Sequence, residues 1–169
     1  YQYHKRFLQL LQADAPGTWN LKMPSHALWI PTLLNIYPDA RLIWTHRDPL
    51  AATGSFCSLI SFAHQTFSVG VDSPWIGKNC LWQATQHAEP IMDARDLLGE
   101  QRIVDVQYSE LMREPIETMR GLYSLLGDEF TEAAESGMRA WLGDNPQDKF
   151  GKHEYKLAQY GLNPQGVTK

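Results

Sequence analysis

The chain has 169 residues, of which 43% are hydrophobic, and its formal net charge at pH 7 is −4. A chain of this length can bury about 70% of its unfolded surface, so a single domain over residues 1–169 is expected. The weak net charge excludes nucleic-acid or anionic-membrane partners held by bulk charge, and any anion site must be local.

Two cysteines without a CxxC spacing predict neither a zinc site nor a disulfide framework. With no signal peptide and no apolar run of about 20 residues that could span a membrane, a cytoplasmic location is expected.

Helical and extended patterns alternate along the chain. A first helix is predicted within residues 1–12, where Tyr3, Phe7 and Leu10 recur at helical spacing. The further elements expected in chain order are a strand at 19–22, a helix at 26–36, a strand at 41–46, a helix from 49 through 61 or a little further, a helix at 74–98 kinked at Pro90 and closed by Gly99, a strand at 102–106, helices at 116–126 and 131–141, and an irregular tail. This alternation predicts an α/β fold in which three strands form a parallel sheet with helices on both faces.

The segment RLIWTHRDPLAATGS, residues 41–55, is typical of an anion site. A short apolar run ends at Arg47, and Asp48 with Pro49 then marks a helix start, because Asp is a favoured N-cap and Pro a favoured first helical residue. The backbone N–H groups and the dipole of that helix attract a negative group, to which Arg47 adds a forked full charge. The predicted ligand is a phosphate or a sulfate.

A second strand-to-helix junction lies upstream, in WNLKMPSHALWIPTLLNIYP at residues 19–38. Lys22 stands at the end of the predicted strand, and His26 follows at the start of the next helix. Ligands of open parallel sheets occupy the crevice outside the carboxyl ends of the strands. We therefore expect Lys22 and Arg47 to lie side by side in the functional site.

The order of these motifs resembles the sulfotransferases that use 3′-phosphoadenosine 5′-phosphosulfate (PAPS). In that family an Arg and a Ser eight residues later grip the 3′-phosphate, and Arg47 and Ser55 match this pair in RDPLAATGS. Further matches are LKMPSH, IVDVQYSELMREP, LYSLLG and DKFGKHEYKLAQYGL, the last being similar to the basic closing segment of the bacterial and broad-specificity branch. The matches cover residues 19–162 in the family's order. They imply a three-layer α/β architecture like that of the P-loop hydrolases.

Members of that family also carry, upstream of the matched segment, a strand and a Gly/Ser/Thr-rich loop that holds the 5′-phosphosulfate. The present sequence contains no such loop, since residues 1–12 already predict a helix, and it contains no Walker-type lysine loop. The resemblance therefore implies the carboxyl portion of a sulfotransferase, incomplete at its amino end.

The resemblance implies transfer of a sulfuryl group from PAPS to a hydroxyl or amine of a small-molecule or glycan acceptor, with PAP (3′-phosphoadenosine 5′-phosphate) as the product. Lys22 is the candidate to stabilise charge on the leaving phosphate oxygen, and His26 is the candidate base for the acceptor proton. In the cytosolic branch the His lies two residues after the Lys rather than four, so a carboxylate in the absent portion is the alternative base. Side-chain cations replace a metal, and none is expected.

Three more residues match contacts of the family. Tyr108 corresponds to a tyrosine that contacts the adenine, and Lys152 and His153 correspond to phosphate contacts in the closing segment. Each match has a structural alternative: Tyr108 caps the core, Lys152 and His153 belong to a solvated surface run, Arg47 pairs with a carboxylate, and His26 is a polar residue of a first helical turn. The alternative function is a non-catalytic module that binds the 3′-phosphoadenosine nucleotide without activating the sulfuryl group.

Overall fold

The structure, a computed structural model, describes residues 1–99, 102–146, 149 and 155–168. The chain divides into two compact units, each of which has its own packing. The first unit comprises Tyr1–Leu42 and Thr85–Arg102, and the second comprises Ile43–Ala84 and Ile103–Lys169. None of the helices in the described ranges has the length and apolar character needed to cross a membrane.

The first unit consists mainly of helices. Its elements are α1 (Gln2–Leu11), the 3-10 helix η1 (Pro24–Trp29), α2 (Ile30–Ile36) and the second half of α4 (Ser73–Leu98). The first predicted helix is confirmed as α1, whose Leu8 is buried while Tyr3 and Leu10 are 82% and 72% exposed. The helical segment predicted at 26–36 begins two residues earlier, at Pro24, and its first part has 3-10 geometry.

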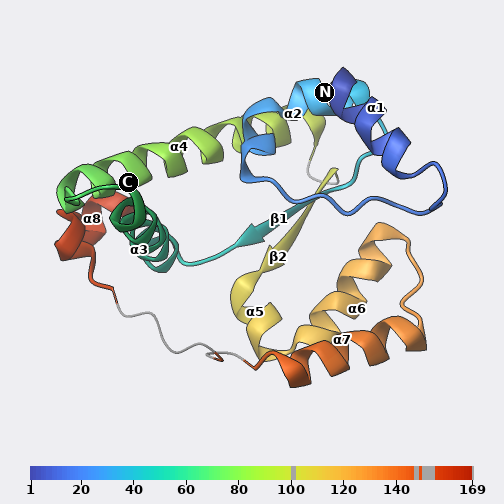
Figure 1. The fold of residues 1–169 in the computed structure, drawn as a ribbon. Coiled ribbons are helices and arrows are strands. Elements are labelled where there is room, and N and C mark those ends of the chain that lie inside the picture. Colours follow the sequence, from blue (N-terminus) through green and yellow to red (C-terminus); the bar gives the residue numbers. More distant parts are fainter. Residues whose placement is uncertain (100–101, 147–148, 150–154, 169) are drawn as a thin grey trace. The chain divides into compact units, whose positions relative to one another are not determined.

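A parallel pair of strands leads to most of the candidate site residues. β1 (Leu42–His46) and β2 (Ile103–Gln107) lie side by side, and they lead into α3 (Pro49–Phe67) and α5 (Tyr108–Arg113) respectively (Figure 1). Ile103 and Val106 on β2 are buried, whereas Ile43 on β1 is 45% exposed. The strands predicted at 41–46 and 102–106 and the α/β class are confirmed.

The strand predicted at residues 19–22 is wrong: this segment has no regular secondary structure. A strand is held by hydrogen bonds to a neighbouring strand, and in the described part of the chain the sheet contains β1 and β2 alone. The apolar side chains of Trp19, Leu21 and Met23 are 42%, 43% and 54% exposed, so no covering layer supports the segment either. The backbone is still extended at Met23, with φ −147° and ψ 119°, before it turns into η1. The expected three-stranded sheet is therefore two-stranded over the described residues.

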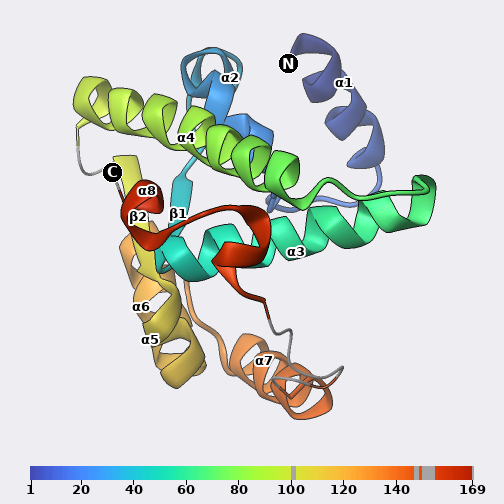
Figure 2. The same ribbon diagram turned by 90° about the vertical axis from the view of Figure 1, so that its left-hand side faces the viewer.

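The core of the second unit lies between α3 and the first turns of α4. Cys57 on α3 and Ile76 and Cys80 on α4 are at most 1% exposed, and Tyr160 from the 3-10 helix η3 (Leu157–Tyr160) packs with them. Both cysteines are free thiols. The short helix α8 (Pro164–Val167) also contacts α3, so the tail lies along that helix (Figure 2). The tail predicted to be irregular thus contains two helical turns.

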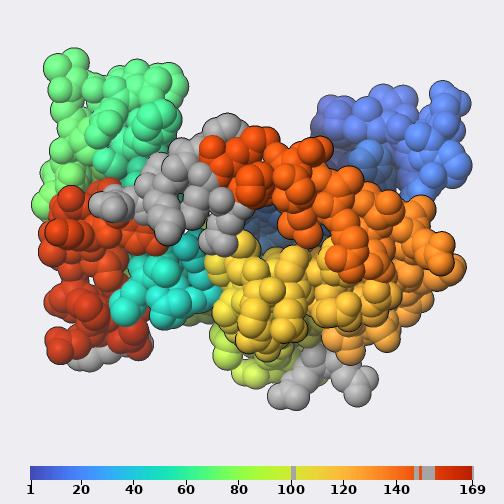
Figure 3. Space-filling model, turned by 90° about the horizontal axis from the view of Figure 1, so that it is seen from below, coloured from blue at the N-terminus to red at the C-terminus, as the bar shows by residue number. Residues whose placement is uncertain are grey.

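A pair of helices follows α5. Figure 3 shows α5, in yellow, and α6 (Pro115–Leu126), in golden yellow to light orange, beside α7 (Glu132–Asp144), in deeper orange. Gly127 ends α6 with a left-handed φ of 72°, a conformation that suits glycine. The Thr131 hydroxyl accepts a 3.1 Å hydrogen bond from the Ala134 backbone N–H and so caps α7. The helices predicted at 116–126 and 131–141 are confirmed, and α5 is an additional short helix before them.

Candidate functional site

The strand-to-helix junction predicted at Arg47 is confirmed. β1 ends at His46 and α3 begins at Pro49, with Asp48 as the N-cap between them. The Asp48 carboxylate accepts a 2.7 Å hydrogen bond from the Ala51 backbone N–H, which satisfies one donor of the first turn. Pro49 has no N–H that needs a partner. These local signals determine where α3 begins, and they leave Arg47 at the carboxyl end of β1.

Tyr108 lies beside Arg47. It follows β2 directly as the first residue of α5, and the carboxyl ends of the two parallel strands bring the side chains together. The Arg47 guanidinium carbon lies 4.9 Å from the centroid of the Tyr108 ring, within the range of a cation–π contact. Arg47 is exposed and Tyr108 is half-buried. The pair therefore offers a cation and an aromatic surface to a ligand at one place.

Ser55 lies two turns into α3 and is half-buried, next to a contact with the tail of the chain. Gly54 is buried because the Tyr155 ring packs where a Cβ atom at position 54 would stand. The Tyr155 hydroxyl donates a 2.8 Å hydrogen bond to the Ala51 carbonyl. No motif marks Tyr155 as a contact of α3, although a glycine inside a predicted helix is a signal for the close approach of another segment.

Lys152 and His153 lie outside the described residues, so their phosphate contacts stay predictions. Tyr155, which is described, packs on the first turns of α3. Lys149 belongs to the same basic run and donates a 2.7 Å hydrogen bond to the Asp144 carbonyl at the end of α7. A cation at that position interacts favourably with the helix dipole, which gives Lys149 a structural role.

His46 has a structural partner on the neighbouring strand. Its Nε2 lies 2.6 Å from Asp105 Oδ1, and its ring lies 4.5 Å from that of Trp44, centroid to centroid. The pair links β1 to β2 one residue before Arg47. This contact holds the end of β1 against β2 and so helps to fix the backbone position of Arg47.

His26 lies in the first unit, where two aromatic side chains surround it. It is half-buried in η1, its Nδ1 lies 2.7 Å from Tyr1 Oη, and its ring centroid lies 6.1 Å from that of His4. Burial, and then the charge of His4, lower the pKa of His26 from its ordinary value of 6.5. At neutral pH the imidazole is therefore in the neutral form, which is the form that accepts a proton. No sequence pattern pointed to Tyr1 or His4.

Lys22 is exposed and lies two residues before η1 begins. It shares the first unit with His26, whereas Arg47, Ser55 and Tyr108 belong to the second unit. The structure brings Arg47 and Tyr108 together. That Lys22 and Arg47 lie side by side in the functional site stays a prediction.

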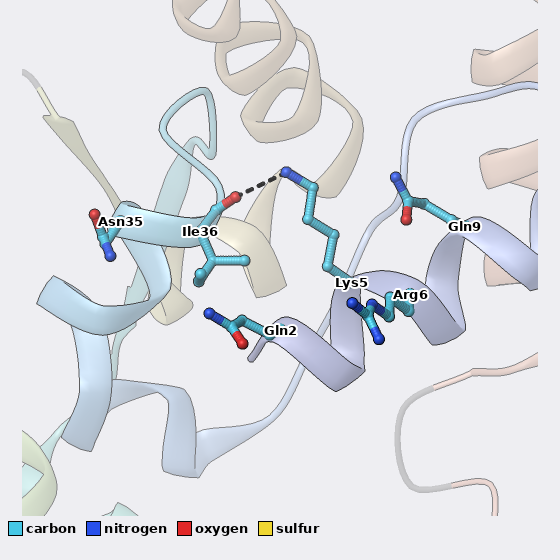
Figure 4. A pocket seen from close by; sticks show the side chains of 6 residues that line it. All are labelled: Gln2, Lys5, Arg6, Gln9, Asn35 and Ile36. Carbon is cyan, nitrogen blue, oxygen red and sulfur yellow. Dashed lines mark hydrogen bonds between the residues drawn. The ribbon is translucent and has the colours of Figure 1, made fainter.

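A polar hollow of about 430 Å³ lies between α1 and the end of α2 (Figure 4). It is lined by Gln2, Lys5, Arg6, Gln9, Asn35 and Ile36. Lys5 Nζ donates a 3.1 Å hydrogen bond to the Ile36 carbonyl and lies 5.7 Å from the centroid of the Tyr37 ring. These contacts hold α1 against the end of α2, and they thereby help to fix the side chains that surround His26.

Residues 1–132 match the profile of the Sulfotransferase family. The chain belongs to this family. The resemblance drawn from RDPLAATGS and LKMPSH is thereby confirmed, and similar solved structures support the fold. The crystal structure of sulfotransferase STF9 from Mycobacterium avium is 41% identical, with a TM-score of 0.90 over 99% of this chain and 43% of that chain. Sulfotransferase STF1 from Mycobacterium tuberculosis H37Rv is 30% identical, with a TM-score of 0.83 over 98% of this chain and 42% of that chain.

A curated relative agrees with these two structures. Omega-hydroxy-beta-dihydromenaquinone-9 sulfotransferase Stf3 from Mycobacterium bovis is 24% identical over 160 residues, which are 93% of this chain and 41% of that protein. The present sulfotransferase chain thus spans less than half the length of the relatives it matches.

Proposed function

We propose that this chain forms part of an enzyme that transfers a sulfuryl group from PAPS to a hydroxyl or amine of an acceptor. The observation that carries the proposal is the contact between Arg47 and Tyr108 at the carboxyl ends of two parallel strands, beside the capped start of α3. A 3′-phosphoadenosine nucleotide presents a phosphate and an aromatic base, which are the two groups that this pair recognises.

Arg47 binds the 3′-phosphate with its forked donors, and the Ser55 hydroxyl supplies a further hydrogen bond from α3. Tyr108 contacts the adenine through its ring. Lys152 and His153 are further candidates for the phosphate contact, as the family resemblance implies. These groups fit the nucleotide by their chemistry. A guanidinium and a hydroxyl donate hydrogen bonds to the phosphate, and an aromatic ring contacts the base.

The transfer step uses the residues of the first unit. His26 accepts the proton of the acceptor hydroxyl or amine as the acceptor atom forms its bond to sulfur, and Lys22 stabilises the negative charge on the phosphate oxygen whose bond to sulfur breaks. PAPS supplies the sulfuryl group and leaves as PAP. Catalysis of this kind depends on positioning and on cationic stabilisation, for which the chain supplies its own side chains.

The acceptor class is supported by a relative. Stf3 is named an omega-hydroxy-beta-dihydromenaquinone-9 sulfotransferase, and the compound in its name carries a hydroxyl. We propose a hydroxyl acceptor here too, because a neutral imidazole such as His26 is suited to take a hydroxyl proton as the new bond forms.

Calorimetric titration of the full-length enzyme with PAP tests the nucleotide site. We expect Arg47→Ala to weaken binding by about 10- to 100-fold, the loss of roughly 1.4–2.8 kcal/mol that removal of one charged hydrogen-bond partner causes. Arg113→Ala is the matched control, since Arg113 is an exposed arginine of the same unit that pairs with Glu114. Equal affinities for wild type and Arg47→Ala would overturn the assignment of the nucleotide site.

The same preparation separates the enzyme from a non-catalytic nucleotide-binding module. Sulfuryl transfer is measured by formation of PAP from PAPS in the presence of hydroxyl acceptors. The enzyme proposal requires PAP formation that depends on the acceptor and falls at least 100-fold in His26→Ala. Tight PAP binding without any transfer would favour the binding module.

A further inference from the structure

We propose that Tyr1 and His4 are positioning residues for His26, with Tyr1 selecting the imidazole tautomer whose Nε2 takes the acceptor proton. The inference rests on the proposed role of His26 as base and extends it to residues that no sequence motif marks. It follows from the contacts around His26, from the chemistry of a neutral imidazole and from the way in which α1 is held.

The contacts around His26 come from one segment of the first unit, the start of α1 with its N-cap residue Tyr1. The Tyr1 hydroxyl lies 2.7 Å from His26 Nδ1, and the two ring centroids are 5.6 Å apart. The ring of His4 meets that of Tyr1 edge-on at 5.9 Å and lies 6.1 Å from that of His26. His26 is therefore held at Nδ1 by one side chain and packed near a second.

A neutral imidazole carries its proton on one nitrogen and accepts protons at the other. If Nδ1–H donates to Tyr1 Oη, then the lone pair of His26 is on Nε2, and Nε2 is the base. This hydrogen bond also persists after Nε2 has accepted a proton, because both nitrogens of an imidazolium are donors. In the opposite arrangement the Tyr1 hydroxyl donates to Nδ1, so the basic nitrogen is already occupied by Tyr1, and this hydrogen bond is lost when Nδ1 is protonated. The Nδ1–H tautomer is thus the one that suits catalysis.

The electrostatic surroundings favour the neutral base. Burial raises the pKa of the Tyr1 phenol, so its oxygen stays a neutral hydrogen-bond partner at physiological pH. The pKa of His26 is lowered by burial and by His4, which faces it from α1. Behind His4 lies Tyr37, whose own pKa is raised by burial and by Tyr1. Lys5 adds a charged group over the Tyr37 ring.

The position of α1 against α2 keeps these groups in place. His4 Nδ1 lies 2.7 Å from the Tyr37 hydroxyl, and Lys5 bonds the Ile36 carbonyl at the end of α2. Hydrogen bonds join Tyr1 to His26 and His4 to Tyr37, so these four rings do more than fill space between the helices. The two Tyr–His pairs therefore form one unit that orients the His26 ring.

Nitrogen NMR of the nucleotide-free, full-length protein tests the role of Tyr1. Two-bond ¹H–¹⁵N correlations distinguish the two tautomers of a histidine, and we expect the Nδ1–H form for His26 in the wild type. In Tyr1→Phe the ring is retained and the oxygen is lost, so we expect the Nε2–H form to gain population and kcat to fall roughly 10-fold with little change in KM. Tyr3→Phe is the matched control, because Tyr3 lies on the same helix with 82% exposure. Identical tautomer spectra in wild type and Tyr1→Phe would overturn the positioning role.

The acid limb of the kcat/KM profile tests the role of His4. The base must be deprotonated, so activity falls as the pH drops through the pKa of His26, and the limb of the wild type is expected below pH 6.5. His4→Gln removes the neighbouring charge, which should move both the limb and the NMR titration of His26 upward. Tyr3→Phe again serves as the control, since Tyr3 is an exposed side chain of α1. An unmoved His26 titration in His4→Gln would contradict the proposal.

Failure of the two ideas gives different results. If His26→Ala keeps full transfer activity, then another group is the base and the proposed role of His26 is wrong, whatever the spectra show. If His26→Ala is inactive but Tyr1→Phe changes neither tautomer nor kcat, then His26 is the base and Tyr1 does not position it.

Discussion

Gly77 is a residue for which the structure leaves no room for a side chain. It lies on α4, and a Cβ atom built on it would stand 3.0 Å or less from the carbonyl group and Cβ of Tyr160 in η3. Backbone atoms cannot move aside as the end of a flexible side chain does, so Gly77→Ala must displace η3 from the core formed with Cys57 and Cys80. We expect a loss of about 1–3 kcal/mol in the free energy of unfolding, measured by urea denaturation.

Gly137→Ala is the matched control for this prediction. Gly137 lies within α7 and has no atom within 4 Å of its Cβ position. Alanine is the better helix former, so the substitution should stabilise by roughly 0.4–1 kcal/mol. If Gly77→Ala were as stable as Gly137→Ala, the close packing of η3 on α4 would be wrong.

The helix pair α6 and α7 is joined by one carboxylate. Glu135 on α7 accepts hydrogen bonds of 2.8 and 2.6 Å from Arg139 and of 2.6 Å from Arg120 on α6. The hydrogen bonds from Arg139 and then Arg120 lower the pKa of Glu135 from its ordinary 4.5. Because the folded-state pKa is the lower one, the stabilisation is complete at neutral pH and is lost as the pH falls through the folded pKa.

We therefore expect Glu135→Gln to be less stable than the wild type at pH 7 and to approach it in stability at pH 3. The urea midpoint of each protein, measured across this range, checks the prediction. Glu129→Gln provides the comparison, as Glu129 is an exposed carboxylate in the connection between the same two helices. A stability difference between Glu135→Gln and wild type that is the same at pH 3 and pH 7 would show that the ion pair does not link the helices.

The elements that sequence alone predicts correctly are those whose signals are local. Asp48 and Pro49 mark the start of α3 through contacts within four residues, and Gly127 and Thr131 delimit α6 and α7 in the same way. The strand at 19–22 fails because a strand depends on a partner elsewhere in the chain. Its apolar alternation is present in the sequence, and the described residues supply no neighbouring strand to pair with it.

Among the candidate site residues too, those that depend on local signals are predictable and those that depend on distant contacts are not. Arg47 and Tyr108 are predictable because each follows a strand, and parallel strands place their ends together. The contacts of His26 with Tyr1 and of Tyr155 with Ala51 join residues 25 and 104 positions apart. Periodicity and capping rules relate residues a few positions apart. Partners so far apart in the sequence are therefore identified only from the folded structure.

At the scale of the whole chain, the reactivity of the two buried thiols measures whether the chain unfolds cooperatively. Cys57 and Cys80 are 0% and 1% exposed in the second unit. Burial raises the pKa of both, and burial together with the charge of Cys57 raises that of Cys80 to about 12. Since the thiolate is the reactive form, both groups should resist a thiol reagent at pH 7.5 until the unit opens.

Helix α4 runs without interruption from Ser73 to Leu98 and contributes residues to both units. Helix formation is cooperative, so loss of either unit removes support from the other half of α4. We therefore expect thiol labelling and the far-UV circular dichroism of the chain to change at the same urea concentration. A Ser136→Cys variant lacking Cys57 and Cys80 gives the rate for an exposed thiol, since Ser136 lies on the surface of α7. Labelling of Cys57 or Cys80 at a urea concentration that leaves the helical signal intact would contradict cooperative unfolding, because the thiols would then be exposed by a local opening of the core between α3 and α4.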